Sequence, residues 1–192
     1  MPARARIRRA TLPPVAAPAA FALVVALALG AGRARAVPPA GARVAPVLVS
    51  ALDGTSMRLP DAKLPVLLFY EDKDAGKQNG RAREVVGVYT DRPDNRARFR
   101  FLAVADVEQW DWWPAKKYVL AEVRRVSKDD DTTVLLDWKG EVRKRWGLTR
   151  GKSGVLLVAA DGKVLFAGEG TLTEAQLKEV TARLVELGAL PR

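Results

Sequence analysis

Apolar residues along the chain fall into short continuous runs separated by stretches with helical spacing. The runs at residues 66–70 and 100–105 predict strands buried on both faces of a sheet, and residues 132–136 predict a third strand. Two amphipathic helices are predicted between these strands, with Pro114 in the first turn of the second. Their apolar faces are Ala82, Val85, Val86 and Tyr89 in the first helix, and Ala115, Val119, Val123 and Val126 in the second.

Two pairs of apolar runs flank Asp-Gly dipeptides and predict β-hairpins. Residues 47–49 and 56–59 lie on either side of Asp53-Gly54, and residues 155–158 and 164–166 lie on either side of Asp161-Gly162. Asp-Gly favours tight hairpin turns because glycine adopts positive φ without strain. A short helix is predicted at residues 140–146, before the second hairpin.

The last predicted helix has clear signals at both ends. Thr173 is placed to cap its first turn, and Gln176 completes a capping box. Leu172 and Leu177 stand at the positions of a hydrophobic staple, and Gly188 ends the helix, with Pro191 beyond it. The buried stripe consists of Leu177, Val180, Leu184 and Leu187.

The order of these elements predicts an α/β domain over residues 47–192. It runs hairpin, strand, helix, strand, helix, strand, short helix, hairpin, helix. Alternating strands and helices imply parallel strands joined by right-handed crossovers, while the closing hairpin adds antiparallel strands. We therefore expect a mixed sheet flanked by helices, with an added N-terminal β-hairpin.

Residues 1–36 have the layout of a secretory signal peptide. A basic start with Arg8-Arg9 precedes an apolar stretch at residues 15–29, and Ala34-Arg35-Ala36 has the pattern of a cleavage site. The alternative is a membrane anchor, but a spanning helix needs about 20 apolar residues and this stretch is shorter and contains Pro18. We expect export to the periplasm or the exterior, by the general or the twin-arginine route, and a flexible leading segment at residues 37–46.

Export changes the meaning of the charge. The net charge of the chain is +10, from 32 basic and 22 acidic residues, but six arginines and no acids lie in residues 1–36. Residues 37–192 therefore carry 26 basic and 22 acidic side chains, a net charge of +4 that is ordinary for a soluble surface. This balance gives no reason to predict nucleic-acid binding, nor any membrane span after signal cleavage.

The chain contains no cysteine and no histidine. This excludes thiol–disulfide exchange, Cys–His or Ser–His–Asp nucleophilic catalysis, and zinc or copper sites built on those ligands. We predict no cofactor and no catalytic residue.

Two stretches resemble the thioredoxin-like superfamily. One is the strand and turn at residues 65–77, and the other is residues 153–168, which are similar to the closing thioredoxin hairpin. The resemblance covers residues 64–188. From Leu136-Asp137 onward, including residues 168–173, the chain is most similar to exported YtfJ-type proteins.

The resemblance places Asp74 and Lys77 where a thioredoxin has its two cysteines, and Ser153-Gly154 where it has a cis-proline. A redox site needs a thiolate and a resolving thiol, which these residues do not supply. The resemblance therefore implies a non-redox domain. Asp74 to Lys77, with Gly76, could hold an anion on free backbone N–H groups, or Asp74 could simply cap the helix.

The aromatic cluster formed by Trp110, Trp112 and Trp113 is the second candidate binding surface. Three tryptophans in four positions do not share one face, so we expect at least one to be exposed for a partner, with burial at the end of the sheet as the alternative. Trp138 and Trp146 are predicted to be core.

Three further patterns could indicate a functional site, but the sequence favours a structural interpretation of each. Residues 147–153 resemble a phosphate-binding loop but have one residue too few and precede a strand, so a basic surface loop is expected. Asp129-Asp130-Asp131 lacks the alternation of a calcium loop and is expected to be a solvated turn. Glu71, Asp72 and Asp74 lie close enough in sequence for acid–base chemistry, but no substrate group is identifiable.

The sequence thus favours a non-catalytic module of the cell envelope that binds a protein or peptide. The alternative is a non-thiol enzyme or small-molecule-binding protein that uses carboxylates and Lys near Asp74. A deep pocket near Asp74 with convergent polar groups and a shifted pKa would favour the alternative, whereas a shallow apolar surface around Trp112 would favour binding.

Overall fold

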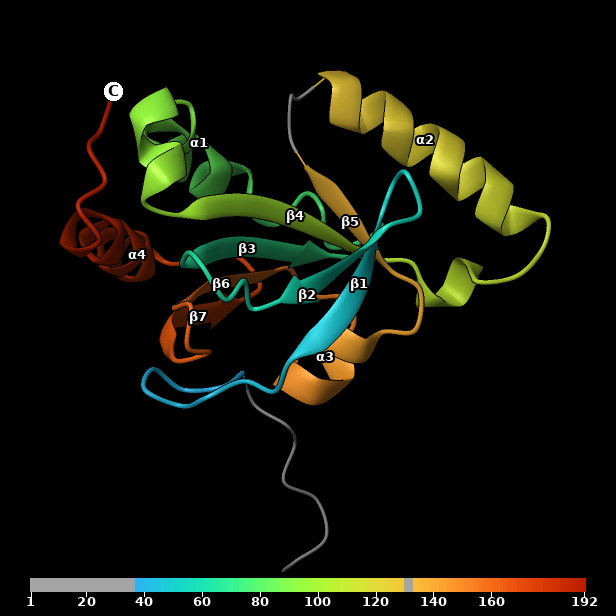
Figure 1. The fold of residues 1–192 in the computed structure, drawn as a ribbon, viewed down its shortest axis with the longest axis horizontal. Helices are drawn as coiled ribbons and strands as arrows, with labels where there is room; N and C mark the ends of the chain where they lie inside the picture. The colour runs from blue at the N-terminus through green and yellow to red at the C-terminus, as the bar shows by residue number, and fades with distance from the viewer. Residues whose placement is uncertain (1–36, 130–132) are drawn as a thin grey trace, which may run out of the picture. The chain divides into compact units, whose positions relative to one another are not determined.

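The buried apolar runs form the middle of a seven-stranded mixed sheet in the order β2-β1-β5-β4-β3-β6-β7. The computed structural model describes residues 37–129 and 133–192 (Figure 1). The strands are β1 (Val47–Ala51), β2 (Ser56–Leu59), β3 (Val66–Glu71), β4 (Arg100–Asp106), β5 (Val134–Asp137), β6 (Gly154–Val158) and β7 (Val164–Glu169). The helices are α1 (Gly80–Thr90), α2 (Ala115–Asp129), α3 (Glu141–Trp146) and α4 (Glu174–Glu186), with 3₁₀ helices η2 (Pro93–Ala97) and η3 (Glu108–Trp110).

The pairing of the strands follows the predicted element order. β3, β4 and β5 are parallel, whereas β6 and β7 are antiparallel to their neighbours. The predicted N-terminal hairpin, β1 and β2, extends the sheet by antiparallel pairing of β1 with β5. The predicted α/β fold, with its mixed sheet and added hairpin, is therefore confirmed.

Side-chain alternation along the strands divides the interior into two cores. Leu68 and Leu102 face the core that Val142 and Trp146 of α3 complete. Residues of opposite parity in β3 and β6 face the second core, which α1 and α4 cover (Figure 1). The prediction that β3 is buried on both faces is confirmed, since residues 66–70 are all buried.

The ends of α4 are as predicted. The Thr173 hydroxyl accepts a hydrogen bond from the Gln176 backbone N–H, and the Gln176 side chain accepts one from the Thr173 backbone. Leu172 and Leu177 are both buried in the second core, and Gly188 follows the helix with a φ of +80°.

The prediction that β4 is buried on both faces is wrong. Leu102 and Val104 are buried, but Phe101, Ala103 and Ala105 on the other face are only partly covered. The cause is α2, which stands apart from the strands (Figure 1) and leaves its own predicted stripe half-buried at Val119 and Val123. Pro114 precedes α2 rather than lying in its first turn.

The two tryptophans predicted to be core differ in burial. Trp146 is buried, and its indole N–H donates to the Ala45 carbonyl oxygen at 2.7 Å. Trp138 is not core, because it is partly exposed beneath the Lys116 ammonium, which lies 4.3 Å from the ring centroid.

Residues 37–46, expected to be flexible, are held by backbone hydrogen bonds between Val164 and both Gly41 and Ala42.

Some predictions fall outside the described residues. The signal peptide at residues 1–36 and the turn at Asp130-Asp131 belong to this group. Within residues 37–129 and 133–192, no helix is long and apolar enough to cross a membrane.

Candidate functional site

Each of the three parallel strands ends in a carboxylate. Glu71, Asp106 and Asp137 are the last residues of β3, β4 and β5, and Asp106 pairs with Asp137 in register. Open α/β sheets usually place ligands at this carboxyl edge. Asp106 and Asp137 are only 6% and 2% exposed, so each needs partners within the protein.

Glu71 is held by a hydrogen-bonded chain that reaches across the sheet edge. The Ser153 hydroxyl, which is fully buried, donates to Glu71 Oε1 at 2.7 Å and accepts from the Asn79 side-chain amide at 2.9 Å. Asn79 Oδ1 in turn accepts from the Leu172 backbone N–H at 3.2 Å. Arg83 forms an ion pair with the other Glu71 oxygen. Burial nevertheless raises the pKa of the Glu71 carboxyl, against the opposing effect of Arg83.

The neighbouring loop is held to residues 151–153 by side chains. Asp72 accepts hydrogen bonds from the backbone N–H groups of Asp74, Ala75 and Gly151, the last at 2.7 Å. The Gln78 side chain accepts from the Ser153 N–H at 3.0 Å and donates to the Gly151 carbonyl oxygen at 2.8 Å. Throughout the described residues, no buried side-chain polar atom lacks a partner. The turn at residues 72–78 is therefore tied to residues 151–153 by a closed hydrogen-bond network.

Asp137 serves the fold at the start of α3. Its carboxylate accepts from the backbone N–H groups of Glu141 and Val142, both at 2.8 Å, and from the Tyr70 hydroxyl at 3.1 Å. Burial raises the pKa of the Asp137 carboxyl, and burial beside two carboxylates raises the pKa of Tyr70. Tyr70 therefore stays protonated and acts as a hydrogen-bond donor.

Glu108, at the start of η3, is the centre of a charge cluster. Arg143, Lys144 and Arg150 all donate to its carboxylate, and Arg143 also donates to Asp106 Oδ2 at 2.8 Å. Gly140 leaves room for this cluster, since a Cβ there would lie 2.8 Å from Arg143 Nη2. The hydrogen bond from Lys144, together with the nearby cations, lowers the pKa of Glu108 against the effect of desolvation. This cluster fixes η3 and so positions Trp110 at its other end.

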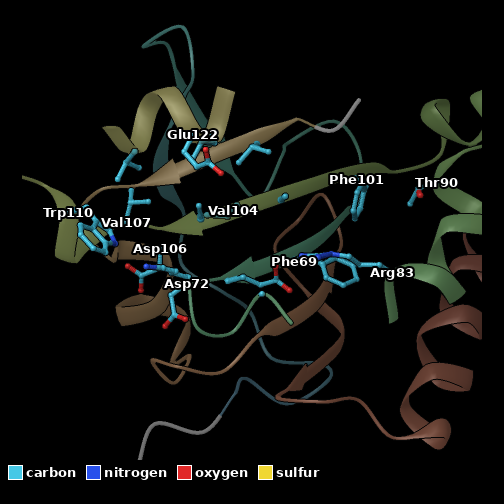
Figure 2. A pocket seen from close by; sticks show the side chains of 18 of the residues that line it. Phe69, Asp72, Arg83, Thr90, Phe101, Val104, Asp106, Val107, Trp110 and Glu122 are labelled. Atoms are coloured by element: carbon cyan, nitrogen blue, oxygen red, sulfur yellow. Dashed lines mark hydrogen bonds and ion pairs between the residues drawn. The ribbon is translucent and has the colours of Figure 1, made fainter. Parts of the chain in front are cut away.

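An apolar groove of about 1230 Å³ lies between α2 and the part of the α1/α4 face of the sheet that those two helices do not reach, and it extends to Val86 and Thr90 of α1. Figure 2 shows Trp110 at one end of it and Phe101 and Arg83 at the other. Its floor includes Ala103 and Ala105 of β4, and its far wall includes Val119 and Val123 of α2. These side chains are too small to fill the space between α2 and the strands.

The structure separates the sequence-predicted site residues into three groups. Trp110 and Trp112 line the groove, whereas Trp113, which is 86% exposed, does not. Ser153 and Gly154 are buried in the closed network and the core. Asp74 and Lys77 are both exposed and lie outside the groove lining.

The expectation that Asp74 caps the first helix is wrong. The turn begins at Asp72, whose side chain accepts the N–H groups of Asp74 and Ala75, and α1 starts only at Gly80. An Asp side chain at the start of a turn commonly accepts hydrogen bonds from the backbone N–H groups that follow it in the turn. Arg150 and Lys152 are exposed in the loop at residues 147–153, as expected of a basic surface loop, and the Gly151 N–H is bound to Asp72 instead of being free for an anion.

Sequence reasoning missed the Glu108 cluster, the Ser153 network and the groove. A weak signal for the first two was available, because carboxylates followed every predicted parallel strand. Nothing in the sequence pattern showed that α2 would stand away from the sheet. In the described part of the chain, no group of acidic residues is arranged to hold a metal ion.

Comparison with solved structures identifies the architecture. A Chlorobium tepidum protein provisionally assigned as the thiol:disulfide interchange protein DsbE aligns with a TM-score of 0.54 at 18% identity, over 77% of this chain and 99% of that one. The peroxidoxin BcpB from Mycobacterium tuberculosis gives 0.52 at 22% identity, over 79% and 97%. The pneumococcal exposed lipoprotein thioredoxin Etrx1, from Streptococcus pneumoniae strain TIGR4, gives 0.50 at 17% identity, over 74% and 99%.

The chain has the thioredoxin-like fold. Residues 113–187 also match the model of a family described as a bacterial protein of unknown function, YtfJ_HI0045. The predicted similarity to YtfJ-type proteins is thus confirmed, over a longer stretch than the sequence patterns indicated. No curated protein matches the chain. The thioredoxin-like domain has no cysteine, so it has no thiol for the exchange chemistry named for its structural relatives.

Replacing Ser153 by alanine tests whether the closed network stabilises the domain. The variant leaves the buried Asn79 amide and the Glu71 carboxylate each short of a partner, so we expect the free energy of unfolding to fall by about 2 kcal/mol. Urea denaturation measures the change. Ser56→Ala, at an exposed position in β2, is the control and should change stability little. Equal stability of both variants would show that the network contributes nothing.

Replacing Glu108 by glutamine tests the charge cluster through its pH dependence. Because the folded-state pKa of Glu108 is lowered, its ionised form stabilises the fold above the unfolded-state value, and this contribution is lost as pH falls through the lowered pKa. We expect Glu108→Gln to cost about 1 kcal/mol at neutral pH and nothing in strong acid. Glu186→Gln, which removes an exposed ion pair with Arg183, is the control and should change stability little. A pH-independent difference between Glu108→Gln and the wild type would contradict the prediction.

Proposed function

We propose that this thioredoxin-like domain is a non-redox module of the cell envelope that binds a protein or peptide segment in the groove beneath α2. The observation that carries the proposal is the groove itself: an apolar channel of about 1230 Å³ on an otherwise covered sheet, with Trp110 and Trp112 in its lining. Binding sites are commonly concave and mostly apolar, with few polar groups. Exposed aromatic side chains beside such a surface are typical of binding anchors.

The closed networks at the sheet edge support binding rather than chemistry. Glu71 and Asp72 line the groove, but each already accepts hydrogen bonds from within the domain, and Ser153, which donates to Glu71, is fully buried. Asp74 and Lys77, on which the alternative of a non-thiol enzyme rests, lie on an exposed turn outside the groove. The apolar lining beside Trp110 and Trp112 supports a binding module, and it forms a groove instead of the shallow surface expected there.

Site-specific photo-crosslinking in the native cell envelope tests this function. Benzoylphenylalanine replaces Tyr118, which is exposed and lines the groove, so one aromatic side chain substitutes for another. A second probe replaces Lys77, and a control probe replaces the exposed Lys178 on α4. We expect a discrete crosslinked product from the Tyr118 position alone. The product should disappear when Ala103→Phe fills the groove, and should persist with Ala182→Phe on the exposed face of α4.

Two results would overturn the proposal. One is a product from Lys77 and not from Tyr118, which would locate binding at the exposed turn. The other is a Tyr118 product that survives Ala103→Phe, which would show that the groove is not occupied.

Location in the envelope is a separate part of the proposal and has its own test. The basic, apolar and small-residue layout of residues 1–36 supports it, as does the name of one structural relative, an exposed lipoprotein. We expect cleavage after Ala36, so that the protein isolated from a bacterial periplasmic fraction begins at Val37. Mass spectrometry of the intact protein measures this. Ala34→Asp combined with Ala36→Asp should leave the precursor uncleaved, whereas a full-length wild-type protein in the cytoplasm would refute export.

A further inference from the structure

The start of α2 and the loop before it expose aromatic side chains to solvent. Among the described residues, seven large apolar or aromatic side chains are exposed, and three of these, Trp112, Trp113 and Tyr118, lie within residues 112–118. Trp113 is 86% exposed and Tyr118 is 72% exposed. The other four are aliphatic and lie on β1, on α1 and in the C-terminal part of the chain. Single exposed apolar residues are ordinary, but a group of exposed aromatic rings marks an interaction surface.

The loop that carries Trp113 is held in one conformation by its own hydrogen bonds. The Trp112 backbone N–H donates to the Trp110 carbonyl oxygen at 2.8 Å, and the Lys116 backbone N–H donates to the Trp112 carbonyl oxygen at 3.0 Å. The Trp112 indole N–H donates to the Gln109 carbonyl oxygen at 3.2 Å. Trp113 is therefore presented to solvent by a fixed turn, so little conformational entropy is lost when its ring is buried against a partner.

Two segments of the chain meet at this surface, residues 106–118 and residues 137–152. The Lys116 ammonium lies 4.3 Å from the centroid of the Trp138 ring and so joins them. The charge cluster around Glu108 joins them again, since all three cations bound to Glu108 come from the second segment. Figure 1 shows the start of α2 and the loop before α3 on the side of the domain away from α4.

Most of the positive charge of the domain is concentrated in these two segments. They contain eight basic and five acidic side chains, a net charge of +3, whereas residues 37–192 as a whole carry +4. Within the described part of the chain, Lys117, Lys139 and Lys152 are exposed and form no ion pair. The same two segments contain all five tryptophans of the protein. We call this combination of exposed rings and lysines the aromatic–basic surface.

We propose that the aromatic–basic surface docks on an anionic lipid bilayer. The Trp113 ring enters the headgroup layer, and the Lys117 and Lys139 ammonium groups lie against lipid phosphates. Tryptophan and tyrosine favour the membrane–water interface, because each combines an apolar ring with a polar N–H or O–H group. Lysines beside such rings add electrostatic attraction to anionic lipids.

The shape of the surface favours a bilayer over an acidic protein. Trp113 projects from a turn and lies outside the groove lining, as do Lys117 and Lys139. A protein partner would need a pocket shaped for the indole ring, whereas a fluid headgroup layer accepts a projecting ring without one. The inference goes beyond the proposed function, since none of these three side chains takes part in binding a segment in the groove.

The test measures co-sedimentation with vesicles of phosphatidylcholine, with and without about 30 mol% phosphatidylglycerol. The protein used begins at Val37, because the basic and apolar residues 1–36 would themselves bind vesicles, and it contains every strand and helix of the described fold. We expect binding to the anionic vesicles to be about tenfold tighter than to the neutral ones at low salt, and most of this difference to be lost at high salt.

A matched pair of apolar variants locates the inserted ring. Trp113→Ser should weaken binding to anionic vesicles about tenfold, because the ring no longer leaves water. Val185→Ser, at an exposed apolar position on α4, should leave binding unchanged. Ala103→Phe, which fills the groove, should also leave it unchanged.

A matched pair of double variants locates the charge. Lys117→Gln combined with Lys139→Gln should remove most of the preference for anionic vesicles. Lys163→Gln combined with Lys178→Gln makes the same change of net charge at exposed positions outside the aromatic–basic surface and should keep the preference. Because all four lysines are exposed, circular dichroism should show an intact fold in both double variants.

Several results would overturn the inference. They are equal binding to neutral and anionic vesicles, no binding to either, and equal effects within either pair of variants. Loss of vesicle binding in Ala103→Phe would show that lipid enters the groove and would also overturn it. So would a discrete protein crosslinked in the native envelope to benzoylphenylalanine at position 113, because the surface would then belong to a protein partner. Absence of vesicle binding leaves peptide binding in the groove, which is tested at Tyr118, unaffected.

Discussion

Three carboxylates at the ends of neighbouring parallel strands set the constraint on which the functional edge of this domain depends. A buried carboxylate is costly unless hydrogen-bond donors or cations surround it. Each carboxylate has different partners. Glu71 binds Ser153 and Arg83, Asp106 binds Arg143 of the charge cluster, and Asp137 binds backbone N–H groups in the first turn of α3. The loops that carry these partners are held in place as a result.

The carboxyl edge of the sheet combines a closed hydrogen-bond network around Ser153 with an open groove beside it. Ser153 links β3 to the loop before β6 through Glu71 and Asn79, while the exposed Asp74 and Lys77 lie on the turn beside this network. The Glu108 cluster extends the same polar framework to η3, which places Trp110 at the end of the groove. Rigid polar contacts thus support an apolar surface that makes few contacts of its own.

Local sequence signals predicted the elements well, because each depends on nearby residues. The capping box of α4 and the Asp-Gly hairpins were identified correctly for this reason. Burial on the second face of β4 was predicted wrongly, because the run at residues 100–105 does not reveal how far α2 stands from the sheet. Asp74 was taken as a cap in place of Asp72, since both precede apolar positions with helical spacing. The contacts of Ser153 join residues more than 70 positions apart, which no local pattern encodes.

The small side chains of the groove belong to neither packed core. Ala103, Ala105, Val119 and Val123 line the groove and are only partly buried, so exchanging them for larger residues fills open space instead of crowding neighbours. Changes here are therefore expected to alter what the groove accepts without endangering the fold. In the binding role proposed above, ligand preference can then diverge during evolution without loss of stability.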